Sequence, residues 1–238
     1  MVSASAVGTI AIDGPAASGK STLGMRMAER FGYLYLDTGV MYRAVTLAAL
    51  ERDVPAEAVA AVSEIARSID IVVRLPTVDD KRQYDVLMDG EDVTWEIRSP
   101  EVDANVSLVS SYPVVRQEMT RIQRQIGLDG DVVMVGRDIG TVVLPEADLK
   151  IYLDASLEER AQRRTMECQQ RGEHVEFEDS LRMMRERDHF DSTRDLAPLT
   201  PAADAVVLDT TDKTADEVLE LGLALVFQAG GETPEGDN

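Results

Sequence analysis

The fold is decided by one stretch of the chain, Gly14-Pro15-Ala16-Ala17-Ser18-Gly19-Lys20-Ser21. Two glycines, separated by four residues and followed by Lys and Ser, match the Walker A template at every defined position. Glycine at both ends lets such a loop turn its backbone N–H groups inward around a phosphate chain. The Lys20 ammonium can then reach the outer phosphates, and the Ser21 hydroxyl is placed to hold Mg²⁺.

The flanks of this stretch have the pattern that a phosphate-binding loop needs. The run Thr9-Ile10-Ala11-Ile12 before it is apolar and β-branched, which suits a buried strand. After it, Leu23, Met27 and Phe31 recur every four residues, as on one face of a helix. Gly32 follows where a helix favours glycine. A glycine-rich turn that binds nothing is the alternative, but a helix N-terminus directly after the loop favours phosphate binding.

Composition narrows the class of protein. The chain has 238 residues and 44% apolar residues, enough for one sizeable core, and no apolar run approaches the ~20 residues that span a bilayer. Residues 1–6 lack the charged and apolar regions of a signal peptide, and the single cysteine, Cys168, fits a reducing cytoplasm. A net charge of −20 argues against nucleic acids and anionic membranes as partners. Arginine outnumbers lysine among the basic residues, which suits bidentate phosphate contacts but also fits a codon bias.

Short apolar runs separated by helical patterns predict a parallel sheet with helices on both faces. The expected strands are residues 7–12, 33–36, 132–135, 149–153 and 205–208. Ligands of such sheets bind beyond the carboxyl ends of the strands, so the residues that follow each strand are candidates for the site. Thr214 and Glu217 are expected to cap a final helix, and His174 and His189 form no metal cluster.

The second strand is followed by Asp37-Thr38-Gly39-Val40-Met41-Tyr42-Arg43, which opens a helix to about residue 52. Asp37 or Thr38 can cap this helix. Arg43 lies one turn in, either facing the loop or solvated. The segment between Pro55 and Pro113 is too long for a loop and predicts an inserted subdomain. Its expected elements are a helix at 56–67, a strand at 69–73, a hairpin turning at Asp89-Gly90, a helix capped by Ser99, and a return helix at 114–126 that Gly127 ends.

The third strand leads directly into Gly136-Arg137-Asp138-Ile139-Gly140-Thr141. At the carboxyl end of a central strand, Arg137 can hold a transferring phosphoryl group. Asp138 can bind Mg²⁺ through water or accept a hydrogen bond from a base. An Arg–Asp ion pair that fixes a turn is the alternative.

An arginine-rich region follows the fourth strand. Ser156-Leu157-Glu158-Glu159 reads as a capping box that opens a helix to residue 171, with Gly172 as its stop, and a second helix is expected at about 178–188. Eight arginines fall between positions 160 and 194. They predict either a lid that closes over phosphates or a solvated face of Glu–Arg pairs, and the number of arginines favours the lid.

Together these motifs resemble bacterial cytidylate kinases over nearly the whole chain. The segments that carry the resemblance are Ile12-Asp13-Gly14-Pro15, Gly19-Lys20-Ser21-Thr22, Asp37-Thr38-Gly39 with Tyr42-Arg43, residues 136–143, Arg187-Asp188 with Asp191 and Arg194, and Pro198-Leu199. The resemblance implies transfer of the γ-phosphoryl group from ATP, with Mg²⁺, to CMP or dCMP. A P-loop kinase for another small acceptor and a nucleotide-dependent switch are the alternatives. The partners expected are these nucleotides only, without nucleic acid or membrane, and we expect a cytoplasmic monomer.

The fold implied is an α/β P-loop kinase core with a five-stranded parallel sheet, an inserted substrate subdomain and a helical lid. The expected boundaries are 7–54, 113–158 and 195–229 for the core, 55–112 for the nucleoside monophosphate subdomain, 159–194 for the lid and 230–238 for a flexible tail.

The resemblance also implies roles for individual residues. The donor nucleotide would be bound by Gly14, Pro15, Ala16, Ala17, Ser18, Gly19, Lys20, Ser21 and Thr22, with Ser21 on Mg²⁺. The catalytic cations would be Lys20, Arg137, Arg160 and Arg164. The acceptor would contact Thr38, Tyr42, Arg43, Ser107, Arg116, Arg137, Asp138, Arg187, Asp191 and Arg194. By the same resemblance, Arg43 and Arg137 hold its phosphate, Arg116, Asp138 and Arg194 meet its base, and Ser107, Arg187 and Asp191 face its sugar.

Two positions depart from the family pattern. Thr38 stands where many members have serine, which keeps the hydroxyl. Val135 stands where an acidic residue usually precedes Gly-Arg-Asp. Asp13 and Asp138 are then the carboxylates left near this strand end.

Overall fold

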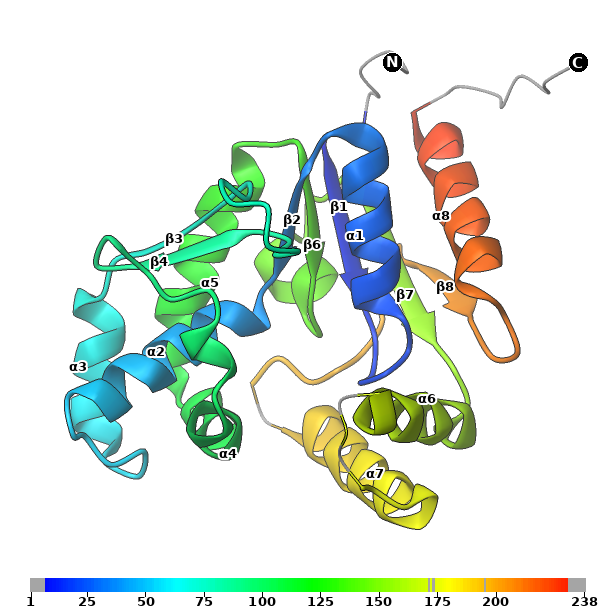
Figure 1. Cartoon of the computed structure of the whole chain (residues 1–238). Coiled ribbons are helices and arrows are strands. Elements are labelled where there is room, and N and C mark those ends of the chain that lie inside the picture. Colours follow the sequence, from blue (N-terminus) through cyan, green and yellow to red (C-terminus); the bar gives the residue numbers. More distant parts are fainter. Residues whose placement is uncertain (1–6, 171, 173, 195, 231–238) are drawn as a thin grey trace, which may run out of the picture. The chain divides into compact units, whose positions relative to one another are not determined.

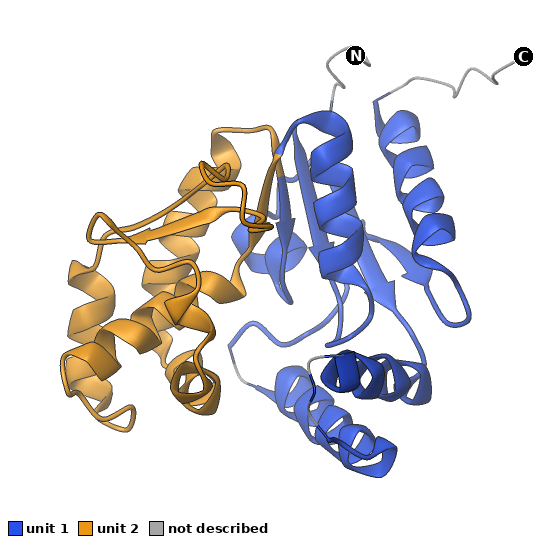
Figure 2. Cartoon of the chain, in the orientation of Figure 1, with its two compact units in different colours: residues 1–33, 133–238 blue, residues 34–132 orange. Residues whose placement is uncertain are grey.

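The computed structural model describes residues 7–170, 172, 174–194 and 196–230. The expectations for residues 1–6, for Arg171 and for the tail beyond residue 230 lie outside these ranges. The chain forms two compact units, one of residues 1–33 and 133–238 and one of residues 34–132 (Figure 2). Within the described ranges, no helix is both long and apolar enough to cross a membrane.

The main sheet has five strands in the order β2-β6-β1-β7-β8. They are β1 (Thr9–Asp13), β2 (Leu34–Asp37), β6 (Val132–Val135), β7 (Leu149–Asp154) and β8 (Val206–Asp209). β7 pairs in parallel with β1 on one side and with β8 on the other. Each strand lies within two residues of its predicted run, so the expected α/β fold with a five-stranded parallel sheet is confirmed (Figure 1).

The strands form because their residues are apolar on both faces. Every residue of β6 is buried, as are Ile10 and Ile12 of β1 and Ile151 and Leu153 of β7. A strand covered on both sides reads as a continuous apolar run, which is the signal that the sequence carries.

Two helices pack together in the first unit, α1 (Lys20–Phe31) and α8 (Ala215–Ala229) (Figure 1). α1 ends at Gly32, whose φ of 73° is left-handed, as predicted. α8 begins with the predicted capping box, in which Thr214 and Glu217 each accept from the other's backbone N–H. The first unit also holds α6 (Leu157–Gln170), α7 (Phe177–Thr193) and one π-type turn, η2 (Ile139–Val143).

The second unit contains a small antiparallel sheet and most of the remaining helices. Its strands are β3 (Ile71–Arg74), β4 (Asp85–Met88) and β5 (Glu91–Asp92). The predicted hairpin turn is confirmed, since Asp89 and Gly90 have φ of 52° and 87°. The helices are α2 (Gly39–Glu51), α3 (Val59–Ser68), the short η1 (Glu96–Arg98), α4 (Pro100–Val109) and α5 (Pro113–Leu128). Ser99 caps α4 as expected, since its side chain accepts from the N–H of Val102.

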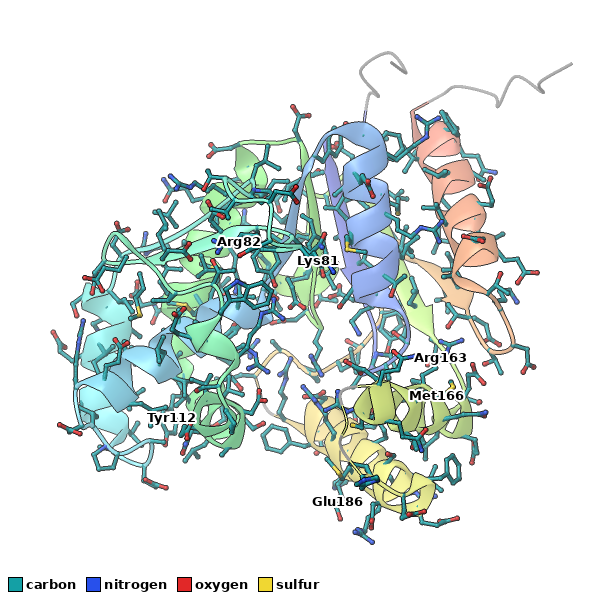
Figure 3. The ribbon with its side chains drawn as sticks, viewed as in Figure 1. Lys81, Arg82, Tyr112, Arg163, Met166 and Glu186 are labelled. Carbon is teal, nitrogen blue, oxygen red and sulfur yellow. The ribbon has the colours of Figure 1, made fainter. Side chains whose placement is uncertain are left out.

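An ion cluster around the buried Arg82 guanidinium holds the turns of this small sheet together. Arg82, labelled in Figure 3, donates to three carboxylates, those of Asp80, Asp85 and Asp92. Hydrogen bonds from Thr94 and Arg82 lower the pKa of Asp92 to about 2. The inserted segment therefore carries its own ion network.

Three predicted helix ends are wrong, and a tertiary contact explains one of them. α3 starts at Val59 instead of residue 56, because the Tyr112 hydroxyl donates to the Ala56 carbonyl and holds that residue in a turn. α5 continues through Gly127, and the chain turns left-handed only at Gly130, with φ of 82°. α7 extends to Thr193, five residues beyond the predicted 188, and there Ser192 and Thr193 hydroxyls bond back to the preceding turn.

The predicted capping box at the start of α6 forms only in part. Glu159 N–H donates to the Ser156 hydroxyl at 3.2 Å. The Glu159 carboxylate instead accepts from Arg163, and the Ser156 N–H donates to Thr211. Arg163, one turn further along α6, and Thr211, 55 residues away, thus replace the partners that the predicted box requires.

The packing of α8 on α1 depends on a glycine. A Cβ at Gly222 would lie 2.9 Å from Leu23 Cδ1 and 3.2 Å from Met27 Sδ. Gly222→Val should therefore lower the free energy of unfolding by about 1–3 kcal/mol through overpacking. Urea denaturation would measure this. Gln228→Val, at an exposed position of the same helix, is the matched control, and an equal loss in both variants would contradict the packing argument.

Candidate active site

The Walker A stretch joins β1 to α1 and has the backbone of a phosphate loop. Gly14, Ala17 and Gly19 have positive φ values of 146°, 60° and 96°. A Cβ at Gly14 would lie 2.0 Å from the Leu153 carbonyl oxygen of β7, so no other residue fits there. The first turn of α1 carries no acidic residue. No carboxylate of the first turn therefore competes with a bound anion for the positive end of the helix.

Two polar groups of the loop suit a phosphate ligand. The Lys20 side chain is buried, and its Nζ donates to the Pro15 carbonyl at 2.6 Å, which keeps the ammonium over the loop. The buried Ser18 hydroxyl has no hydrogen-bond partner among the described residues. An unsatisfied buried hydroxyl is costly unless a ligand meets it.

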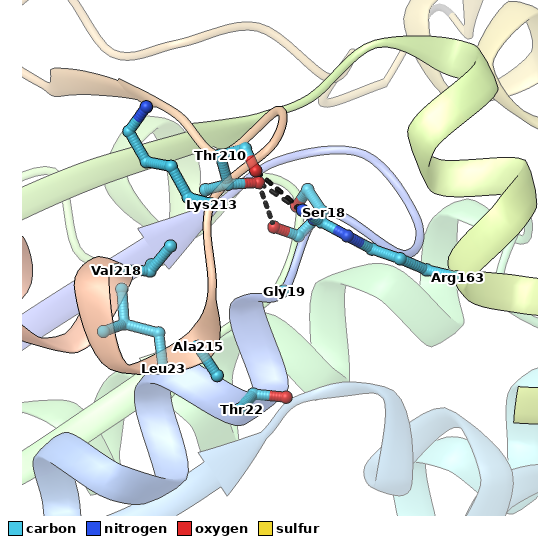
Figure 4. Close-up of a pocket in the computed structure, with 9 residues that line it drawn as sticks. All are labelled: Ser18, Gly19, Thr22, Leu23, Arg163, Thr210, Lys213, Ala215 and Val218. Atoms are coloured by element: carbon cyan, nitrogen blue, oxygen red, sulfur yellow. Dashed lines mark hydrogen bonds between the residues drawn. The ribbon is translucent and has the colours of Figure 1, made fainter. Parts of the chain in front are cut away.

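A cavity of 190 Å³ opens beside the loop, against the start of α1 (Figure 4). Thr210, which follows β8, donates to the Ser18 carbonyl at 3.0 Å. Arg163 of α6 donates to both the hydroxyl and the carbonyl of Thr210, at 3.0 and 2.6 Å. Thr22 and Lys213 complete the polar part of the lining. The cavity therefore combines a cation, hydroxyls and an apolar wall next to the phosphate loop.

Arg160 connects the loop to both arginine-rich helices. Its side chain is 5% exposed. The guanidinium donates to the Ala16 carbonyl of the loop at 3.3 Å and to the Ala155 carbonyl at 3.0 Å. It also forms a bidentate pair with Asp188 of α7, at 3.0 and 2.6 Å. Such a fork holds a planar cation in a defined orientation.

Several other arginines of α6 and α7 pair within their own helix. These pairs are Arg163 with Glu159 at 2.9 Å, Arg164 with Glu167 at 3.0 Å and Arg182 with Asp179 at 2.6 Å. Arg187 is exposed on α7. Local pairing of this kind is the alternative interpretation of the arginine cluster, whereas Arg160 reaches the phosphate loop.

Four of the predicted acceptor residues lie together in the first unit. Arg137 Nε donates to Asp191 Oδ2. Arg194 lies 3.9 Å from the Asp191 carboxylate and 4.0 Å from that of Asp138. Asp138 and Asp191 are both buried. The loop after β6 and the end of α7 thus present two arginines and two carboxylates to one another.

A further carboxylate supports this cluster from β1. Asp13 is 4% exposed, and its two oxygens accept the backbone N–H groups of Ile139 and Gly140 at 2.8 and 2.7 Å. Burial raises its pKa to about 6, with a smaller contribution in the same direction from Asp138. The two N–H donors and Lys20 act against that rise.

The second unit holds five of the predicted acceptor residues. Tyr42 and Arg116 come together there, with the guanidinium 5.7 Å from the ring centroid. Arg43 donates to the Ile97 carbonyl at 3.1 Å and to Asp103 at 2.6 Å. Thr38 is buried and Ser107 exposed. At the start of α2, Asp37 accepts from Gly39 N–H, whereas the Thr38 side chain makes no cap bond.

The donors available for Mg²⁺ fit an ion that is held chiefly by substrate. The Ser21 side chain is exposed at the start of α1. Among the described residues, no three His, Cys, Asp or Glu side chains gather as a metal site. Both Asp13 oxygens already accept hydrogen bonds. Mg²⁺ commonly keeps several waters and is held largely by substrate phosphates, which is compatible with the single Ser21 hydroxyl on the protein side.

A Walker A loop at the carboxyl end of β1 in a five-stranded parallel sheet places this protein in the class of P-loop kinases. Comparison with known proteins narrows the class. Residues 10–228 match the family model described as Cytidylate kinase, so the chain belongs to the cytidylate kinase family. The resemblance deduced from the sequence motifs is therefore confirmed.

Relatives of known name match nearly the whole chain. A cytidylate kinase of Herpetosiphon aurantiacus is 50% identical over 218 residues, which cover 92% of this chain and 93% of the relative. One of Chloroflexus aggregans is 54% identical over 215 residues, covering 90% and 92%. One of Desulfitobacterium hafniense is 46% identical over 216 residues, covering 91% of each chain.

Sequence reasoning did not single out the cavity beside the loop. Arg163 was one arginine among eight, and Thr210 and Lys213 belong to no motif. A signal was available, because Thr210 follows a predicted strand, where ligands of parallel sheets bind. That rule could have selected Thr210, but it could not pair this residue with Ser18.

The Arg160–Asp188 fork gives a stability prediction. Asp188→Asn leaves a buried guanidinium without its countercharge and should lower the free energy of unfolding by about 1.5–3 kcal/mol. Asp179→Asn is the matched control on the same helix, because Asp179 pairs with a guanidinium that is 65% exposed. That control should change stability by less than about 0.5 kcal/mol. Equal effects in urea denaturation would mean that the fork is no stronger than a surface pair.

Proposed function

We propose that this protein transfers the γ-phosphoryl group of ATP to CMP or dCMP, giving CDP or dCDP and ADP. The observation that carries the proposal is membership of the cytidylate kinase family over residues 10–228, with the Walker A loop intact. A switch that hydrolyses a nucleotide slowly is disfavoured by the same match, as is a kinase for an unrelated acceptor.

The donor is proposed to lie along the loop, with its phosphates at residues 14–22 and its nucleoside in the adjacent cavity. The unpartnered Ser18 hydroxyl and the Lys20 ammonium support the phosphate position. Arg163, Thr210 and Lys213 support the nucleoside position. Ser21 would hold Mg²⁺, which neutralises charge on the donor's phosphate oxygens when bound.

For the acceptor, each unit contributes its own set of proposed contacts. In the first unit, Arg137 would hold the phosphate, Asp138 and Arg194 the base, and Asp191 and Arg187 the sugar. In the second unit, the matching motifs assign acceptor-binding roles to Thr38, Tyr42, Arg43, Ser107 and Arg116. In the structure, Arg137 already donates to Asp191, so the acceptor phosphate would compete with Asp191 for Arg137.

The reaction needs positioning more than covalent help from the protein. An acceptor phosphate oxygen attacks the γ-phosphorus as the bond to the β–γ bridging oxygen breaks and ADP leaves. Charge spreads over the equatorial oxygens of the transferred group. We propose that Lys20, Arg137, Arg160 and Arg164 stabilise this charge, with α6 and α7 acting as the lid. We also propose that the protein works as a cytoplasmic monomer. The finer domain boundaries deduced from the sequence stay a prediction.

A coupled assay of ADP formation tests the activity directly. With ATP and Mg²⁺, kcat/KM should be highest for CMP and dCMP, lower for UMP by roughly 6- to 160-fold, and negligible for AMP and GMP. Equal efficiency on CMP and UMP would mean a broader pyrimidine kinase. Nucleotide hydrolysis without any effect of an acceptor would support the switch instead.

Lys20→Met tests the phosphate loop. Lys20 supplies a point charge to the transferred group, so its loss should reduce kcat by roughly a hundredfold or more while circular dichroism stays unchanged. Lys213→Met is a control that removes a lysine of the cavity wall instead, and it should act mainly on the KM for ATP. A folded Lys20→Met enzyme with near-normal kcat would contradict the assignment.

Asp138→Asn tests which group reads the base. A carboxylate accepts from the cytosine N4 amine but repels the uracil O4 acceptor, whereas an amide can donate to O4. The variant should narrow the difference in kcat/KM between CMP and UMP about tenfold. An unchanged ratio with a reduced rate would place Asp138 away from the base.

A further inference from the structure

Asp13 occupies a position that the motifs leave without a role. It is the last residue of β1 and directly precedes Gly14 of the phosphate loop. Its side chain points to a different segment, the turn η2, where the carboxylate accepts hydrogen bonds from the N–H groups of Ile139 and Gly140. Asp13 thus adjoins the phosphate loop through its backbone and contacts the turn after Arg137 and Asp138 through its side chain.

The first N–H groups of the turn η2 need a hydrogen-bond acceptor from outside the turn. The Asp138 carbonyl accepts from Val142 and Val143 N–H, at 2.9 and 3.1 Å, which closes the turn. The N–H groups of Ile139 and Gly140 are the first of the turn, and like those at any helix N-terminus they have no carbonyl of that turn to meet. Asp13 satisfies both, which is capping by a residue 126 positions away.

Close packing holds the turn against this carboxylate. A Cβ at Gly140 would lie 3.4 Å from Asp13 Oδ2 and 3.2 Å from Lys150 Cδ. Lys150 cannot easily retreat, because its Nζ bonds to the Pro145 carbonyl and, at 2.6 Å, to Asp204. Gly140 therefore lies between the carboxylate of one strand and the lysine stem of the next.

We infer that Asp13 is a positioning residue for the acceptor nucleotide, because it fixes the turn that follows Arg137 and Asp138. This inference rests on the proposed function. A shift of the turn moves Asp138, its N-terminal residue, and with it the carboxylate proposed to meet the base. Both Asp13 oxygens act on the backbone of the turn, through the hydrogen bonds from Ile139 and Gly140. The expected defect is therefore on the acceptor side.

The decisive variant is Asp13→Asn. An amide has one oxygen to accept, and its NH₂ would face the second N–H group, donor against donor. We expect kcat/KM for CMP to fall about tenfold or more, chiefly through KM, as the loss of a charge-assisted hydrogen bond implies. The CMP/UMP ratio should fall too, while the KM for ATP changes by less than about threefold. A simple loss of stability would not separate the two substrates in this way.

Asp148→Asn is the matched control, because Asp148, the residue before β7, binds the opposite end of β1. Asp148 also accepts two backbone N–H groups, those of Gly8 and Thr9, at 2.9 and 2.8 Å. These bonds share one oxygen, Oδ2, which the amide oxygen of asparagine can replace, so neither the KM for CMP nor the CMP/UMP ratio should change. Should Asp13→Asn fail to fold, Gly140→Ala crowds the same turn and should reproduce the acceptor-side defect.

Hydrogen exchange separates this inference from the proposed function. In Asp13→Asn, and not in Asp148→Asn, the amides of Ile139 and Gly140 should exchange faster without any nucleotide present. If the wild type fails to phosphorylate CMP, the proposed function is wrong. Hydrogen exchange still tests whether Asp13 holds the turn η2 in place. Unchanged exchange in Asp13→Asn, or equal changes in the KM for CMP and for ATP, would overturn the positioning role.

Discussion

The close approach of Gly14 to the Leu153 carbonyl of β7 is the constraint on which the rest of the structure depends. It lets the chain turn out of β1 within the space between two paired strands and start α1 at once. The loop therefore sits at the carboxyl edge of the sheet. There the Ala16 and Ser18 carbonyls become acceptors for groups that follow β7 and β8. A side chain at position 14 would displace the loop from all of these contacts.

A protein with a net charge of −20 still holds guanidinium groups at the carboxyl ends of its strands. It does so by placing arginines against carboxylates, as in Arg160 with Asp188 and Arg137 with Asp191. Each pair lowers the cost of burying a guanidinium and sets its orientation before a ligand arrives. Phosphate oxygens offer the same bidentate geometry as a carboxylate, so in the proposed mechanism they would substitute for it with little rearrangement.

Features decided by local chemistry were predictable. The five strands are continuous apolar runs, the turn at Asp89-Gly90 has residues that tolerate positive φ, and Thr214 caps α8 by a bond to its own neighbour. Two of the errors occur where another side chain takes a group that the predicted local bond needs. Tyr112 takes the Ala56 carbonyl that a longer α3 would have used, and Arg163 takes the Glu159 carboxylate from its capping box.

By itself, the sequence determined the fold class, the family and the identity of the phosphate loop, because these follow from residue types at fixed spacing along the chain. Only the tertiary structure decided which residues far apart in the chain come into contact. It selected Asp188 as the partner of Arg160, and Thr210 with Arg163 as the wall of a cavity beside Ser18. It also turned the Asp13 side chain to the turn after β6. These pairings depend on strand order and side-chain direction, which no local pattern encodes.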